Sequence, residues 1–165
     1  MIRDARLDDA TSVTTYRSDP LVTRFQRWNP TVDEFRASIE RQAGQPPFSL
    51  DDWHLLVIEL RSTGETVGDV GVFRESTGDV LLGITVAPEF QRRGFAIEAL
   101  TVVCPFVFER CDAQALIARI DPANEASLAL FDRLGFVEDI RVDGEVTMRL
   151  RKPRLRRGHP STGSG

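Results

Sequence analysis

A six-residue stretch, QRRGFA at residues 91–96, has the residue types that bind an anion. It separates a run that reads as a strand, VLLGITVAP, from a run that reads as a helix, IEALTVVCPFVFER. The first amides of a helix lack intrahelical partners, and the helix dipole adds about half a positive charge there. Gly94 leaves room for an anion, Ala96 keeps the next turn small, and Arg92 and Arg93 add charge unless they are merely solvated. The junction therefore predicts a pyrophosphate site.

Other anion-binding and catalytic motifs are missing from the chain. There is no G-x-G-x-x-G, and the only lysine, Lys152, is too far from any glycine-rich loop for a P-loop. It is also poorly placed for Schiff-base chemistry. Cys104 and Cys111 lie seven residues apart, and His54 and His159 stand alone, which does not match a metal-ligand pattern. We therefore expect no bound metal.

Size and charge indicate one acidic domain followed by a basic tail. The 165 residues are 41% hydrophobic, enough for one core, and no run reaches the roughly 18 to 20 apolar residues of a membrane span. With no signal peptide evident at the start, we expect a cytoplasmic protein. Residues 1–150 carry 16 basic and 25 acidic residues, net −9, which favours a cationic partner over nucleic acid. Residues 151–165 carry five basic residues and predict a disordered tail or, alternatively, a binding arm.

The N-terminal half should fold as two helices followed by three strands. A first helix is expected from about Asp8 to Asp19, before Pro20, which disfavours helical geometry in the preceding residue. The capping-box pattern TVDE at 31–34 predicts a second helix that ends at Gly44. Apolar runs at 53–60, 66–73 and 79–86, separated by turn residues, then predict antiparallel neighbours.

The C-terminal half should supply a crossover. Apolar residues recur at helical spacing from Ile97 to residue 110, although Pro105 inside this run predicts a bend near Thr101. A buried strand at 113–121, a short helix stopped by Gly135 and a strand at 145–151 follow. Since a helix connects strands 79–86 and 113–121, these two should run parallel within a mixed, mostly antiparallel sheet.

Residues 91–96 match the Q/R-x-x-G-x-G/A signature of the GNAT superfamily of acyl-CoA-dependent N-acetyltransferases. The stretches VGDVGVF, APEFQRRGFAIEAL and RIDPANEASLALFDRLGF resemble, in that order, the RimJ/RimL-type branch. The resemblance covers residues 1–150, with a first strand shortened to a few residues around 2–5. It implies an α/β (α+β) fold in which helices cover both faces of the sheet and the parallel pair splays apart at the cofactor site.

The resemblance also implies which residues bind acetyl-CoA. The backbone of the signature would hold the pyrophosphate, and the strand end at Thr85 and Val86 would pair with the pantetheine arm. Asn124 would reach that arm, Ser127 would lie near the sulfur, and Phe131 would line the CoA wall. Asn124 is equally explained as a helix N-cap, and Phe131 as a core residue. The signature comprises Gln91, Arg92, Arg93, Gly94, Phe95 and Ala96.

In this family the amine attacks acetyl-CoA directly, and we expect the Val86 amide to stabilise the oxyanion. The family's general-acid tyrosine is replaced by Phe131, and its strand glutamate by Leu81 and Leu82. Ser127 is the remaining candidate acid, although it is also an ordinary first-turn residue. Asp69 is the remaining candidate base, unless it simply faces solvent.

The acceptor pocket is expected to involve the stretch RFQRWNP, where Phe25 and Trp28 would pack on the substrate or, alternatively, cover the core.

The leading hypothesis for the function is an N-acetyltransferase that acts on a primary amine. The acceptor would be a small amine, an aminoglycoside-like polyamine or a peptide N-terminus. The alternatives are a non-catalytic acyl-CoA-binding module and a dimer subunit with a vestigial site. Exposed edge strands near the C-terminus predict a homodimer.

Overall fold

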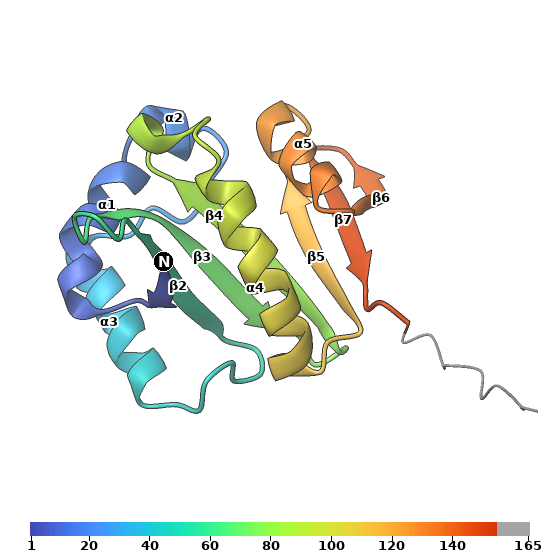
Figure 1. Cartoon of the computed structure of the whole chain (residues 1–165), viewed down its shortest axis with the longest axis horizontal. Helices are drawn as coiled ribbons and strands as arrows, with labels where there is room; N and C mark the ends of the chain where they lie inside the picture. Colours follow the sequence, from blue (N-terminus) through green and yellow to red (C-terminus); the bar gives the residue numbers. More distant parts are fainter. Residues whose placement is uncertain (155–165) are drawn as a thin grey trace, which may run out of the picture.

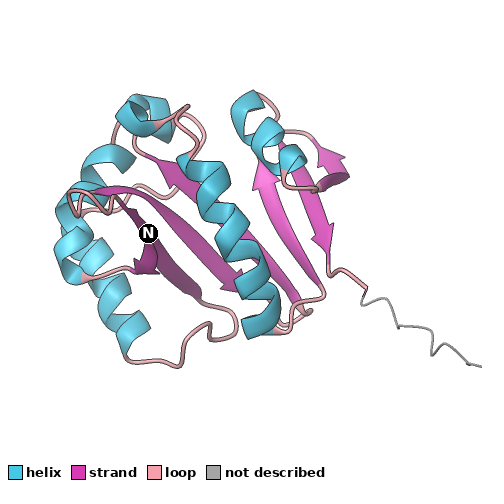
Figure 2. Cartoon of the chain, in the orientation of Figure 1, coloured by secondary structure: helices cyan, strands magenta, loops and turns pink. Residues whose placement is uncertain are grey.

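The computed structural model describes residues 1–154 as a seven-stranded sheet with helices on both faces (Figures 1 and 2). The strand order is β1-β2-β3-β4-β5-β7-β6. The strands are β1 (Ile2–Asp4), β2 (Trp53–Glu59), β3 (Thr66–Arg74), β4 (Asp79–Val86), β5 (Ala115–Ile120), β6 (Val137–Val142) and β7 (Glu145–Arg151). The helices are α1 (Ala10–Arg17), α2 (Pro20–Thr23), α3 (Val32–Ala43), α4 (Phe95–Cys111) and α5 (Glu125–Arg133), with 3-10 turns η1 (Leu7–Asp9) and η2 (Pro88–Phe90). The predicted fold class is confirmed.

The predicted capping box opens α3. The Thr31 side chain accepts from the Glu34 amide at 3.2 Å, and the Glu34 carboxylate accepts from the Thr31 amide at 2.8 Å. Phe35 and Ile39, one turn apart, are buried against the sheet. Before it, α1 lies within the helix expected at residues 8–19. Pro20 starts a further short helix, α2, which was not predicted and is capped by the Asp19 side chain.

The sheet opens between β4 and β5. These strands run parallel, as predicted, but they pair only where Asp79, Val80 and Leu81 face Ala115, Leu116 and Ile117. β4 continues to Val86 and stays paired with β3 along its other edge. The last part of β4 therefore has one edge without a strand neighbour.

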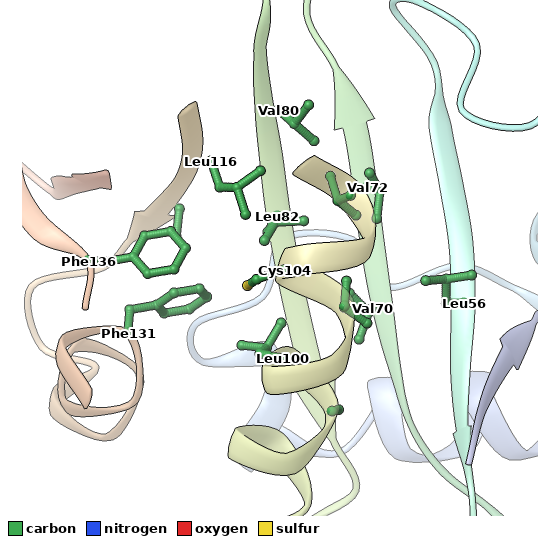
Figure 3. Close-up of a cluster of buried hydrophobic side chains, with 14 of the residues drawn as sticks. Leu56, Val70, Val72, Val80, Leu82, Leu100, Cys104, Leu116, Phe131 and Phe136 are labelled. Atoms are coloured by element: carbon green, nitrogen blue, oxygen red, sulfur yellow. The ribbon is translucent and has the colours of Figure 1, made fainter. Parts of the chain in front are cut away.

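The two faces of the sheet pack against different helices. α4 covers one face and contributes Leu100, Val103 and Val107 to the larger core. Figure 3 shows Phe131 and Phe136 turned toward Leu116 in that core. The other face is covered by α1 and α3, whose buried residues include Val13 and Phe35. Among residues 1–154, no helix combines the length and apolar character needed to cross a bilayer.

α4 begins at Phe95 and runs without interruption to Cys111, with Pro105 inside it. Proline lacks the N–H that would bond to the carbonyl of Thr101, and this loss costs about 3 kcal/mol in a free helix. Here Val103, Cys104 and Val107 around the proline are all buried, so packing holds the helix together. The predicted bend near Thr101 stays a prediction.

The last strand and its contacts run slightly past residue 150, where the sequence predicts the start of the tail. Arg151 is the last residue of β7, the Lys152 amide donates to the Gln114 carbonyl at 3.0 Å, and its ammonium group lies 2.9 Å from Asp112. The rest of the predicted tail, residues 155–165, lies outside the described residues.

Candidate active site

A cleft of about 400 Å³ lies beside the open edge of β4. It is bounded by the end of β4, the loop that enters α4, the first turns of α5, and α2 with the residues that follow it. The structure thus brings together most of the predicted cofactor residues. Those lining the cleft are Thr85, Val86, Gln91, Arg92, Gly94, Phe95, Ala96, Asn124 and Ser127.

The N-terminus of α4 faces this cleft without a side-chain cap. Its N-cap is Gly94, with φ +84°, and no side chain of residues 1–154 accepts a hydrogen bond from its first amides. Arg92 also has a positive φ, +60°, which is uncommon for a residue with a Cβ. By contrast, α3 and α5 are capped by Thr31 and Asn124. The uncapped amides of α4 thus lie at the cleft, where the sequence predicts an anion site.

Two glutamine side chains bond to the open edge of β4. Gln26 donates to the Ile84 carbonyl at 3.2 Å, and Gln91 donates to the Val86 carbonyl at 3.0 Å. Along a strand, the backbone N–H and C=O groups of successive residues point to opposite edges. Those of Ile84 and Val86 therefore point away from β3. Their amides thus point toward the cleft edge, where an extended chain could pair with them.

The Thr85 hydroxyl is buried and has no hydrogen-bond partner among the described residues. A buried polar group without a partner costs about 1 to 3 kcal/mol, so such groups usually mark a missing ligand or water. Thr85 lines the cleft together with the uncapped amides of α4. The uncapped amides of α4 and the open edge of β4 fit a ligand that carries phosphate groups at one end and hydrogen-bonding groups along its length, as coenzyme A does.

The residues of α5 divide between cleft and core. The Asn124 side chain accepts from the Ser127 amide at 3.2 Å, so it acts as an N-cap at the cleft wall. Ser127 lines the cleft, within reach of a ligand. Phe131 is instead buried, with its ring centroid 5.0 Å from that of Phe136, and it does not line the cleft. The alternative interpretation of Phe131 as a core residue describes its position better than the CoA wall does.

Asp69 does not reach the cleft, which argues against the base role predicted for it. It is 2% exposed and accepts hydrogen bonds from Arg17 and from the Tyr16 hydroxyl. Burial raises the pKa of Tyr16 well above its usual value, and the charge of Asp69 raises it further. Burial alone would lower the pKa of Arg17, but the Asp69 carboxylate raises it overall. We assign this cluster a structural role.

The remaining predicted residues lie partly at the cleft and partly away from it. Phe25 lines the cleft, whereas Trp28 stacks 6.2 Å from Phe35 and covers the Arg17 guanidinium at 4.7 Å from its ring centroid. Trp28 thus follows the core-covering alternative. Arg93 does not line the cleft but lies over the rings of Phe90 and Phe95, at 5.3 and 5.7 Å.

Sequence reasoning missed two residues that shape the site. Gln26 lies in the expected acceptor stretch, but nothing in its neighbours indicates a bond to β4. From the sequence alone, Arg17 would be expected to lie in solvent on a helix. The structure instead places Asp69 of β3 beside it. Both contacts join segments more than 50 residues apart, so no local pattern could have revealed them.

Comparisons with known proteins agree with this geometry. The sequence profile of the family described as "Acetyltransferase (GNAT) domain" matches residues 1–137. A relative from Bacillus licheniformis, described as an uncharacterized N-acetyltransferase p20, is 26% identical over 150 residues, covering 84% of this chain and 79% of its own.

Two solved structures show the same fold. A variant of spermidine N-acetyltransferase from Vibrio cholerae has a TM-score of 0.74 at 15% identity, and aminoglycoside acetyltransferase AAC(6')-Ib with coenzyme A and kanamycin has 0.75 at 12%. Each comparison covers 92% of this chain and 94% of the other. The placement within the RimJ/RimL-type branch stays a prediction. The chain belongs to the GNAT acetyltransferase family and is an acyltransferase enzyme.

Proposed function

We propose that the protein transfers an acetyl group from acetyl-CoA to a primary amine by direct attack in a ternary complex. The observation that carries this proposal is the uncapped N-terminus of α4, which faces the same cleft as the unpaired edge of β4. An anion site followed by a strand edge suits a diphosphate followed by the two amides of a pantetheine arm. When bound, acetyl-CoA supplies an activated thioester.

Binding would use the backbone more than the side chains. The amides of residues 92–96 would hold the diphosphate, with Arg92 adding positive charge at the rim. Ile84 and Val86 would pair with the arm along β4, where Gln26 and Gln91 now bond to the carbonyls.

Two groups would serve the chemical step. The Val86 amide would donate to the oxygen that becomes negative when the amine attacks, which lowers the barrier electrostatically. The Ser127 hydroxyl would give a proton to the leaving thiolate, directly or through water. Because Asp69 is held in its ion pair, the amine would have to enter already neutral or lose its proton to water.

The test has two readouts on the purified full chain. Acetyl-CoA should raise the melting temperature, and a thiol reagent should detect release of free CoA when a primary amine is added. A raised melting temperature without thiol release across spermidine, kanamycin and peptide amines would indicate an acyl-CoA-binding module instead. If acetyl-CoA has no effect on the melting temperature, the proposed cofactor site is wrong.

A further inference from the structure

A second cavity, of about 610 Å³, adjoins the cofactor cleft. Phe25 and Gln26 line both, and the Gln26 amide is bonded to β4 at Ile84. The other walls are the end of β5 and the turn between β6 and β7. A molecule in this cavity would therefore lie next to the strand end where the thioester is proposed to bind. A volume of this size suits a few residues of peptide or a comparable small molecule.

The charge of this cavity differs from that of the rest of the domain. Three of the residues that line it are basic, Arg24, Arg27 and Arg119, and two are acidic, Asp121 and Glu145. Residues 1–150 as a whole have 16 basic and 25 acidic residues. Arg119 is already paired, with Glu75 at 3.4 Å and Glu145 at 4.0 Å. The wall thus has a basic excess in an acidic protein.

The two remaining arginines have no carboxylate partner within salt-bridge distance among residues 1–154. Arg24 lies over the ring of Phe25, 4.9 Å from its centroid, which holds it at the wall that the two cavities share. The two acids that line this cavity have other partners: Asp121 accepts from the Ala123 amide at 2.8 Å, and Glu145 lies 4.0 Å from Arg119. Two guanidinium groups are therefore free to bind an anion.

We propose that the acceptor is the α-amine of an acidic peptide, with Arg24 and Arg27 binding a carboxylate near its N-terminus. This inference rests on the proposed acetyl transfer. Guanidinium groups bind carboxylates through two parallel hydrogen bonds, which also fixes the direction of the bound peptide. A polyamine or aminoglycoside would bring several positive charges against the same two arginines and be repelled.

The basicity of the amine supports the same acceptor. A lysine-type amine has a pKa near 10.4, so it needs a base, whereas an α-amine near 7.7 to 8.0 is partly neutral at physiological pH. The one carboxylate predicted as a base, Asp69, is held by Arg17 away from both cavities. An acceptor that is partly neutral on arrival fits a site built this way.

The experiment compares three tripeptide amides that differ only at their second residue: Ala-Asp-Ala, Ala-Asn-Ala and Ala-Lys-Ala. For the full-length protein with acetyl-CoA, kcat/KM should be about fivefold higher for the aspartate peptide than for the asparagine peptide, as expected for exposed ion pairs. It should be lowest for the lysine peptide. The preference should shrink as the salt concentration rises.

A charge-reversed variant, Arg24→Glu with Arg27→Glu, should invert the order of the aspartate and lysine peptides. The matched control, Arg36→Glu with Arg61→Glu, changes the net charge equally at exposed positions that line neither cavity and should keep the original order. Equal kcat/KM for the three peptides, or a preference for spermidine or the lysine peptide, would overturn the acceptor assignment and leave acetyl transfer intact.

If no amine is acetylated, the acetyl-transfer proposal fails, and calorimetric titration of the peptides into protein saturated with CoA still tests the acceptor. Tighter binding of the aspartate peptide would then support an acidic-peptide site at Arg24 and Arg27, although not its role as an acetyl acceptor. Equal binding of the three peptides, or none, refutes it.

Discussion

Arg17 and Asp69 form a buried ion pair that ties α1 to β3, with the Arg17 Nε atom 3.0 Å from one carboxylate oxygen. A second nitrogen of the guanidinium bonds to the other oxygen, and a third donates to the Trp28 carbonyl at 3.0 Å. The pair thereby anchors the loop around residues 24–29, which contributes to the walls of both cavities. Asp69, which was predicted to do chemistry, instead helps to position the segment that is proposed to receive the substrate.

Replacing Arg17 with Met should lower the free energy of unfolding by about 3 to 5 kcal/mol, because it leaves the Asp69 carboxylate buried without a counter-charge. Urea denaturation at neutral pH measures this loss. The matched control is Arg41→Met: its pair with Asp52 leaves the arginine side chain 50% exposed, so the loss should stay under about 1 kcal/mol. Similar losses in both variants would mean that the Arg17 pair is effectively solvated.

Replacing Gly94 with Glu should weaken acetyl-CoA binding by tenfold or more, on the order expected from removing an anion site and adding a like charge. A Cβ at Gly94 would meet nothing within 4 Å in the described part of the chain, so the new side chain would occupy the space proposed for the diphosphate. Calorimetric titration with acetyl-CoA gives the affinity.

Gly64→Glu is the control for this variant. Gly64 has φ +73°, against +84° for Gly94, and its Cβ would likewise meet nothing within 4 Å. Both substitutions therefore carry a similar left-handed backbone cost of about 1 to 2 kcal/mol. Only Gly94→Glu should lose affinity. An unchanged affinity would contradict the placement of the diphosphate.

Much of the fold was predictable because its signals are local. The capping box of α3, the alternating strands and the helical spacing of α4 each depend on residues within a few positions of one another. The junction between β4 and α4 was predictable for the same reason, since strand end, glycine turn and helix start are contiguous. The short helix α2 was missed, because a proline that ends one helix also suits the first position of the next.

The rest of the site depends on contacts between distant segments. The position of Asp69 on its strand was readable, but whether it faced solvent or an arginine depended on where α1 packs. Phe131 could line either the cleft or the core. The orientation of α5 about its axis places it in the core, against Phe136. Side-chain direction within a correctly predicted element was thus the least predictable property.

Replacing Ser127 with Ala should lower kcat about tenfold or more while leaving the affinity for acetyl-CoA unchanged, since a proton donor contributes to the reaction and little to binding. Ser127 lines the cleft, and its amide, which stays in the variant, makes the bond to Asn124. Thiol release under saturating acetyl-CoA measures kcat. Ser38→Ala, which removes a hydroxyl bonded within α3, serves as the control. Equal kcat in wild type and Ser127→Ala would remove the serine from the mechanism.

The predicted homodimer would use β6, the edge strand of the sheet, on which Val137, Ile140 and Val142 are 66%, 53% and 57% exposed. An unpaired edge that carries apolar side chains favours association with another chain. Sedimentation velocity should show a dimer for the wild type and a monomer for Ile140→Lys. Val102→Lys, at a position 59% exposed on α4, should remain dimeric. A wild-type monomer at all concentrations tested would refute the prediction.

Stability should fall at acidic pH partly through Asp9, which bonds to Arg3, the Arg6 amide and Thr66. Burial alone would raise the pKa of Asp9, but these hydrogen bonds and the Arg3 charge lower it below its usual 3.8. A lowered pKa stabilises the folded state at pH values above that usual value, and this contribution is lost as the pH falls through the native pKa.

The variant Asp9→Asn should therefore have an unfolding free energy about 2 to 3 kcal/mol lower than that of the wild type at pH 7. This difference should become progressively smaller below about pH 4. Urea denaturation across this range, with exposed Asp8→Asn as control, measures the gap. A gap that stays constant with pH would show that the loss comes from packing and not from the charge of Asp9.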